Sequence, residues 1–116
     1  MSEQPEMAFK VLTSSQMEAL LTNGRFAGAP IDLADGYIHL STAAQLDETV
    51  AKHFAGQSGL HIAAIDLVRL GDAVRWEPSR GGQLFPHIFG ALPMSAVTGH
   101  CPLEFGQDGS IVIPVA

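Results

Sequence analysis

The sequence predicts a single α+β domain, with a mainly antiparallel sheet and its two main helices early in the chain. A length of 116 residues suits one domain, and we expect it to span residues 1–116 with its core at about 8–115. Hydrophobic residues make up 47% of the chain and charged residues 16%, which is typical of a compact globular protein. Two helical patterns precede a series of short strands instead of alternating with them, which favours α+β over α/β.

The first elements are a strand, a helix and a loop. A strand is expected over residues 8–12. Thr13 is a suitable helix cap because Gln16 lies three residues further on, the spacing of a capping box, and Gly24 ends the helix. Residues 27–34 are expected to form a loop.

A second strand and helix follow a turn at Asp35-Gly36. Residues 37–40 read as the strand, and Ser41 or Thr42 caps the helix, which ends at Gly56. The helix carries apolar or aromatic residues at core-facing spacing, namely Ala43, Leu46, Val50, His53 and Phe54. The rest of the chain shows short strand patterns at residues 60–66, 73–77, 85–89, 96–105 and 110–115. Pro102 should mark a break or an edge position in its strand.

Charge and cysteine content exclude several classes of partner. The net charge of −6, with only six Lys and Arg, argues against non-specific binding of nucleic acid and against anionic membrane surfaces. No apolar run approaches the roughly 20 residues of a membrane span, and the N-terminus lacks the pattern of a signal peptide. Cys101 is the single cysteine, which fits a reducing compartment, so a cytoplasmic location is expected.

The densest group of unusual residues lies at 75–90, and a second group lies at 35–42. The first contains the only Trp of the chain, charged residues and a glycine-rich turn, a mixture that suits a ligand site better than a core. In the second, Tyr37, His39 and Ser41 share one face of a strand whose other face is aliphatic. Together the two groups predict a small-molecule pocket.

Ser41 and Thr42 lie where the strand becomes a helix, so their hydroxyls and the free N–H groups there could hold a phosphate or carboxylate. The alternative is that both are only helix caps and that His39 binds a backbone carbonyl. Glu77 could act as a general base or hold ribose hydroxyls, or it could form a surface pair with Arg75.

The glycine-rich turn and the strand after it hold two further candidates. Arg80 precedes two glycines, which would let its guanidinium and the backbone approach a ligand. His87 lies between two aromatic residues of one strand face, as a stacking platform or as a core histidine. The common zinc spacings, the nucleophile elbow and the glycine-rich nucleotide motifs are absent from the sequence. A site using His39, His87 and Glu77 as metal ligands is the weakest reading.

Three segments resemble the bacterial family called domain of unknown function, number 952. They are residues 36–42 with Gln45, residues 74–77 and residues 85–93. That family has been grouped by fold with the ADP-ribosyltransferases and the RNA 2′-phosphotransferases. The resemblance implies an ADP-ribosyltransferase-like fold with a split sheet and a nucleotide-sized cleft.

The resemblance also implies roles for individual residues. His39 matches the residue that holds the NAD ribose, and Glu77 or His87 would serve the reacting end, so these three are the candidate catalytic residues. The expected ligand-binding residues are Tyr37, Ser41, Thr42, Gln45, Trp76 and Arg80. The leading expectation is binding or turnover of NAD or a related nucleotide by a transferase of the ADP-ribosyl or 2′-phosphoryl type, with NAD as a substrate and no metal ion. The alternative is a non-catalytic module that binds a metabolite or a protein.

Overall fold

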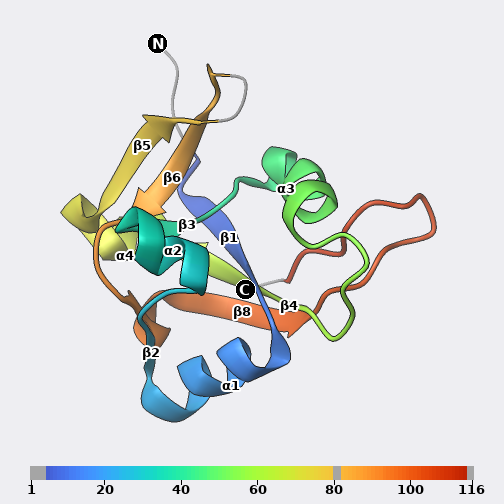
Figure 1. Ribbon diagram of the computed structural model, residues 1–116, viewed down its shortest axis with the longest axis horizontal. Helices are drawn as coiled ribbons and strands as arrows, with labels where there is room; N and C mark the ends of the chain where they lie inside the picture. The colour runs from blue at the N-terminus through green and yellow to red at the C-terminus, as the bar shows by residue number, and fades with distance from the viewer. Residues whose placement is uncertain (1–4, 80–81, 115–116) are drawn as a thin grey trace.

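A computed structural model of the chain describes residues 5–79 and 82–114, and it shows a mixed α+β fold (Figure 1). Every strand pairing in the described part is antiparallel. One sheet has the order β1-β4-β8, with strands Met7–Leu12, His61–Asp66 and Val97–Pro102. A second has the order β3-β6-β5, with strands Ile38–His39, Leu84–Ile88 and Val74–Pro78. A third pairs β2 (Arg25–Phe26) with β7 (Leu92–Pro93).

The two larger sheets meet at one point, where β1 passes the end of β3. Phe9 and Ser41 form an isolated antiparallel bridge there, each N–H donating to the other residue's carbonyl at 2.8 and 2.9 Å. The helices of the described residues are α1 (Ser14–Asn23), α2 (Pro30–Asp35), α3 (Leu46–His53) and α4 (Leu67–Leu70). The predicted combination of antiparallel sheets with helices early in the chain is confirmed.

Alternation along β1 divides the core into two clusters. Ala8 and Leu12 belong to the cluster that contains apolar residues of α1 and of one face of the β3-β6-β5 sheet. Phe9 and Val11 join the cluster that packs against Leu46 of α3. Lys10, in the middle of this strand, is also buried, with 6% of its surface exposed. A cation inside an apolar strand needs a partner, and that partner defines the site described below.

Several local expectations are confirmed at the level of single hydrogen bonds. Thr13 caps α1, and the Gln16 side chain accepts the Thr13 N–H at 2.9 Å, completing the capping box. Gly24 ends the helix in the left-handed conformation, with φ of +75°. Pro102 is the last residue of β8, which is an edge strand of its sheet, as the sequence indicates.

Three expectations about local structure are wrong. Residues 27–34 are not a loop, because α2 begins at Pro30, where proline's fixed φ suits the first position of a helix. The second helix starts as a 3₁₀ turn over Ala43–Gln45, and on its predicted core stripe Ala43 and His53 are exposed. Within residues 110–114 the only pairing is a single bridge from Ile111 to Phe105, so the last predicted strand does not form there.

No helix in the described ranges has the length and apolar character needed to cross a membrane.

Candidate functional site

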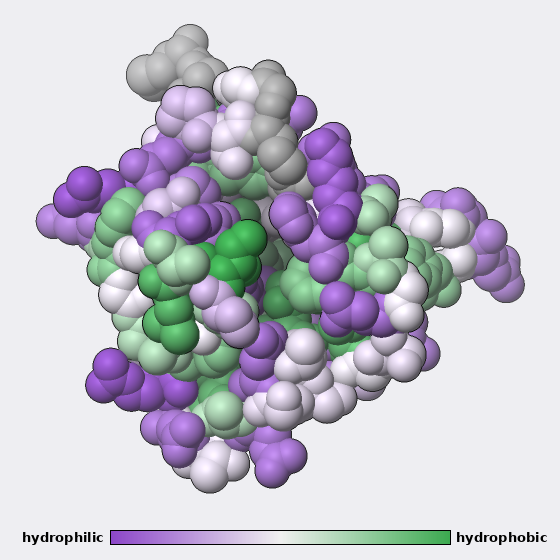
Figure 2. All heavy atoms as spheres, viewed as in Figure 1, coloured by the Kyte–Doolittle hydropathy of each residue, from purple (hydrophilic) through white to green (hydrophobic). Residues whose placement is uncertain are grey.

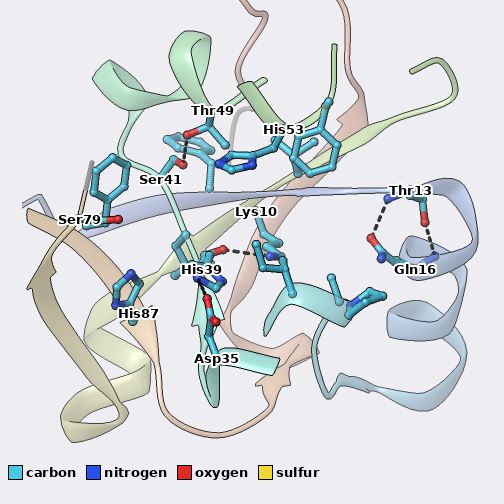
Figure 3. A pocket seen from close by; sticks show the side chains of 18 of the residues that line it. Lys10, Thr13, Gln16, Asp35, His39, Ser41, Thr49, His53, Ser79 and His87 are labelled. Carbon is cyan, nitrogen blue, oxygen red and sulfur yellow. Dashed lines mark hydrogen bonds and ion pairs between the residues drawn. The ribbon is translucent and has the colours of Figure 1, made fainter. Parts of the chain in front are cut away.

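A cavity of about 630 Å³ opens where the two larger sheets meet, between α2 and α3 (Figures 2 and 3). Figure 2 shows the hollow near the centre of this face, bordered by both hydrophobic and hydrophilic residues. Its volume lies within the range of small-molecule sites, roughly 300–1,000 Å³. The polar side chains that line it are Lys10, Thr13, Gln16, Asp35, His39, Ser41, Thr49, His53, Gln57, Ser79 and His87. Phe9, Phe54 and Phe85 contribute aromatic surface.

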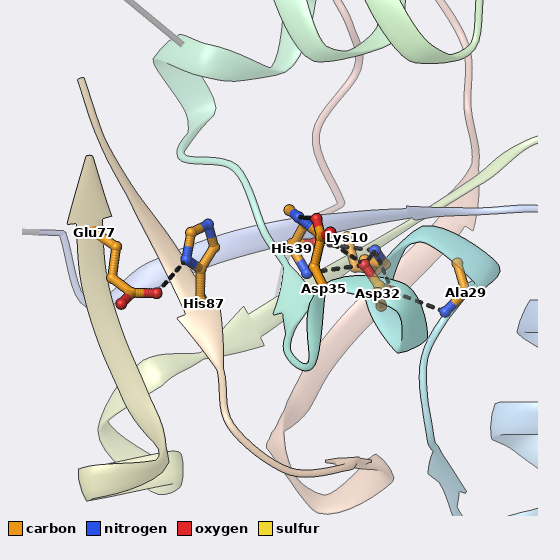
Figure 4. A network of polar contacts seen from close by, with 7 residues as sticks. All are labelled: Lys10, Ala29, Asp32, Asp35, His39, Glu77 and His87. Atoms are coloured by element: carbon orange, nitrogen blue, oxygen red, sulfur yellow. Dashed lines mark hydrogen bonds and ion pairs between the residues drawn. The ribbon is translucent and has the colours of Figure 1, made fainter. Parts of the chain in front are cut away.

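Asp32 is the centre of a buried polar network beneath the cavity (Figure 4). Its carboxylate, 1% exposed, is 2.9 Å from the Lys10 ammonium and 2.6 Å from Nδ1 of His39. It also accepts the N–H groups of His39, at 3.1 Å, and Ala29, at 2.8 Å. Lys10 in turn donates to the His39 carbonyl at 3.0 Å. One carboxylate therefore ties β1, the start of α2 and β3 together and fixes the His39 ring.

The other nitrogen of His39 also contacts a carboxylate. Nε2 lies 3.0 Å from Asp35, the last residue of α2, whose side chain is 44% exposed. An ionised carboxylate can only accept hydrogen bonds. Both contacts can therefore be hydrogen bonds at the same time only when both ring nitrogens of His39 carry a proton.

His87 is the direct cross-strand neighbour of His39, and their ring centroids are 5.4 Å apart. Its side chain is 3% exposed, and its Nδ1 is 2.8 Å from Oε1 of Glu77 on the adjacent strand β5. Tyr37 stacks on the His87 ring at 4.1 Å with an interplanar angle of 25°. The geometry thus places two carboxylate-bound histidines side by side at one cavity wall, as the sequence grouping of residues 35–42 and 75–90 predicts.

The remaining predicted residues have different positions. Ser41 lines the cavity and hydrogen-bonds to Thr49 at 2.7 Å. Tyr37 and Glu77 contact His87 but do not line the cavity themselves. Thr42 does not line it either; its N–H donates to the Gln45 side chain at 3.0 Å.

Gln45 and Trp76 serve the framework around the cavity. The buried Gln45 amide donates to the Leu84 carbonyl at 2.8 Å, which joins the turn before α3 to the start of β6. Trp76 points to the other face of β5 and packs against the core cluster that contains Ile88. Arg80 lies outside the described residues.

Sequence reasoning missed several residues of the site, above all Lys10 and Asp32. A signal for Lys10 was present, because a lone cation interrupts the apolar run of residues 7–12. The sequence predicts His53 on the core-facing stripe of its helix, but in the structure it lines the cavity. Asp32, Thr49 and Ser79 carry no local pattern that distinguishes them from ordinary polar residues.

The reading of His39, Glu77 and His87 as metal ligands gains no support from the geometry. Within residues 5–79 and 82–114 no group of three or more His, Cys, Asp and Glu side chains is arranged to hold a metal ion. Two of the imidazole nitrogens that such a site would need already contact Asp32 and Glu77.

Burial and the contacts of the polar network explain the direction in which each pKa is shifted. Burial by itself would raise the pKa of Asp32, but the hydrogen bond from His39 and the charge of Lys10 outweigh it and hold that pKa well below its usual range. Burial lowers the pKa of the Lys10 ammonium, although Asp32 acts in the opposite direction. Burial also raises the pKa of the Tyr37 phenol, with a further contribution from Asp35 and Glu77.

The depressed pKa of Asp32 predicts a specific loss of stability in acid. A carboxyl whose pKa is lower in the folded state contributes stability above its unfolded pKa, about 4, and loses it as the pH falls through the folded value. Unfolding free energies measured by denaturant titration between pH 3 and pH 7 should therefore show the wild type losing more stability below about pH 4 than an Asp32→Asn variant. Parallel pH curves for the two proteins would contradict this assignment.

Comparison with known proteins gives the family and the fold. The model of the family described as "Protein of unknown function (DUF952)" matches residues 11–100. The crystal structure of protein CC0527 from Caulobacter crescentus is 42% identical, covers 91% of this chain and 93% of its own, and has a TM-score of 0.83. The solution NMR structure of CC0527 is also 42% identical, with 91% of each chain covered and a TM-score of 0.77. Comparison with curated proteins gave no match.

The family match includes every candidate residue of the site from Val11 to His87, and the similarity to CC0527 extends over nine-tenths of the chain. The resemblance inferred from residues 36–42 with Gln45, residues 74–77 and residues 85–93 is thereby confirmed, and the chain belongs to the DUF952 family of proteins of unknown function.

Proposed function

We infer that the cavity binds NAD or a related nucleotide that carries an ADP-ribosyl group. The observation that supports this most is the adjacent placement of His39 and His87 at the wall of one cavity. A nucleotide needs hydrogen-bonding groups for ribose and phosphate, and aromatic surface for a base. The cavity offers both, with the hydroxyls of Ser41 and Thr49 near the histidines and Phe54 in its lining.

In this proposal His39 and Ser41 hold the ribose or a phosphate. His87 contacts the reacting end of the ligand, because it lines the cavity whereas Glu77 contacts only the Nδ1 side of its ring. Glu77 is then a positioning residue that fixes the orientation of His87. Arg80 would serve the pyrophosphate, as the sequence suggests. The proposal takes the fold as ADP-ribosyltransferase-like, on the grounds of its antiparallel sheets that meet beside a nucleotide-sized cavity.

A titration followed by amide NMR tests the proposal. Addition of ADP-ribose or NAD should shift the amides of residues 37–45 and 82–90 together, and that of His53, because all of them lie at or beside the cavity. The amide of His100, on β8 and outside the cavity lining, should stay in place. If neither nucleotide shifts these amides, nucleotide binding is wrong.

Release of nicotinamide from NAD separates turnover from binding. A non-catalytic module would show the same amide shifts without any nicotinamide. This second reading has one observation in its favour, since Glu77, the candidate carboxylate for ADP-ribosyl transfer, contacts His87 instead of lining the cavity.

A further inference from the structure

The two histidines differ in the contacts of their Nε2 atoms, although each has its Nδ1 on a carboxylate. Nδ1 of His39 contacts Asp32 and Nδ1 of His87 contacts Glu77, at 2.6 and 2.8 Å. A carboxylate on Nδ1 holds the ring with a proton on that nitrogen. Nε2 is then the nitrogen in which the two rings differ, and both rings line the same cavity.

Nε2 of His39 faces a second carboxylate, that of Asp35, which can only accept a hydrogen bond, so this nitrogen is placed to act as a donor. Nε2 of His87 has no hydrogen-bond partner among the described residues. When Nδ1 of His87 donates its proton in a hydrogen bond to Glu77, Nε2 of the neutral ring carries a lone pair. The two rings thus differ in the surroundings of Nε2, because a carboxylate faces Nε2 of His39 and none of the hydrogen bonds or ion pairs of the described residues involves Nε2 of His87.

We propose that His39 and His87 form a general acid–base pair that hydrolyses a phosphodiester of a nucleotide. The proposal rests on the proposed function in placing an adenine nucleotide in the cavity, and it adds a reaction on nucleotide esters, since NAD and ADP-ribose carry a pyrophosphate instead of an ester with an alkoxide leaving group. Cleavage of the glycosidic bond of NAD makes no use of a general acid, because nicotinamide leaves without taking up a proton. Displacement at a phosphodiester does, because an alkoxide leaving group needs one. The ring centroids are 5.4 Å apart and both rings line one cavity, so a single phosphate group bound there would lie beside both histidines.

In the reaction, water is the nucleophile. Nε2 of His87 takes a proton from the water as its oxygen forms a bond to phosphorus. The bond from phosphorus to the leaving oxygen breaks, its electron pair goes to that oxygen, and Nε2–H of His39 gives it a proton. The products are a nucleoside monophosphate and an alcohol. For this step Nε2 of His39 must leave Asp35, whose side chain is 44% exposed to solvent.

Two substrates with different leaving groups test the assignment. Adenosine 5′-(methyl phosphate) releases an alkoxide that needs a proton, whereas adenosine 5′-(4-nitrophenyl phosphate) releases a stable phenolate that does not. His87→Ala should lower kcat about 10²–10⁴-fold on both esters, because both need the base. His39→Ala should cause a similar loss on the methyl ester and a much smaller one on the nitrophenyl ester. His100→Ala, at an exposed position outside the cavity lining, should leave both rates unchanged.

The pH profile gives an independent check. On the methyl ester the wild type should show a bell-shaped kcat profile, whose acid limb disappears in His87→Ala and whose alkaline limb disappears in His39→Ala. The charged and titratable groups that face His39 are Lys10, Asp32, Asp35, Tyr37 and His87. Among residues 5–79 and 82–114, those that face His87 are Tyr37, His39, Arg75 and Glu77.

His87 is buried, so Glu77→Gln provides a second variant at a position whose side chain is 38% exposed. Glu77→Gln should lower kcat by the same factor on both esters, because Glu77 acts through His87 and both esters need that base. The proposal is overturned if the wild type hydrolyses neither ester faster than buffer does. It is also overturned if His39→Ala slows both esters equally. Amide shifts with ADP-ribose but no hydrolysis would reject the acid–base pair alone, whereas an absence of shifts would reject nucleotide binding itself.

Discussion

An Asp32→Asn variant is expected to lose about 3–5 kcal/mol of unfolding free energy, the usual cost of removing one partner of a buried ion pair. The loss arises because the Lys10 ammonium stays 6% exposed and no longer faces a negative charge. The His39 ring loses its charged acceptor at the same time. Denaturant titration at pH 7 gives the difference directly.

Asp35→Asn is the matched control for this experiment. It removes the other carboxylate on His39, but one whose side chain is 44% exposed, so the expected cost is at most about 1 kcal/mol. Equal destabilisation by the two substitutions would show that burial of the Lys10–Asp32 pair does not matter.

A double variant tests the stated cause. Combining Lys10→Met with Asp32→Asn removes the unpaired charge as well, so the double variant should be more stable than Asp32→Asn alone. If it is no more stable, the uncompensated Lys10 charge is not what destabilises the single variant.

A His39→Ala variant is expected to weaken ADP-ribose binding about 10- to 150-fold, which corresponds to the loss of a hydrogen bond to a charged group. This prediction rests on the nucleotide site inferred above, in which His39 contacts the ribose or a phosphate. Calorimetric titration well below the melting temperature of the variant isolates affinity from stability. His100→Ala, which alters an exposed histidine outside the cavity lining, should bind as the wild type does.

A different result for His39→Ala would show that His39 has a structural role instead of a role in binding. A lower melting temperature with unchanged affinity of the folded protein would make His39 a structural partner of Asp32 and nothing more. Its side chain is 31% exposed at the cavity, which is why we expect the effect on binding to dominate.

Local patterns in the sequence were sufficient for most of the elements. The capping box at Thr13 and Gln16 specifies the start of α1, since both of its hydrogen bonds lie within four residues. Alternation of apolar and polar residues specified which side of β3 faces the core, with Ile38 and Leu40 buried at 1% and 2% exposure. The loop expected over residues 27–34, which contain Gly28 and Pro30, is wrong because proline also favours the first turn of a helix, and α2 begins at Pro30.

The sequence by itself also determined that residues 35–42 and 75–90 carry the unusual polar groups, because composition and alternation are visible along a single chain. Only the tertiary structure decided which of them meet. The antiparallel register of β3 and β6 puts His39 opposite His87. The bridge from Phe9 to Ser41 brings β1 alongside, so that Lys10 reaches Asp32, 22 residues away in the chain. Pairings of this kind depend on packing between distant segments, and no local pattern encodes them.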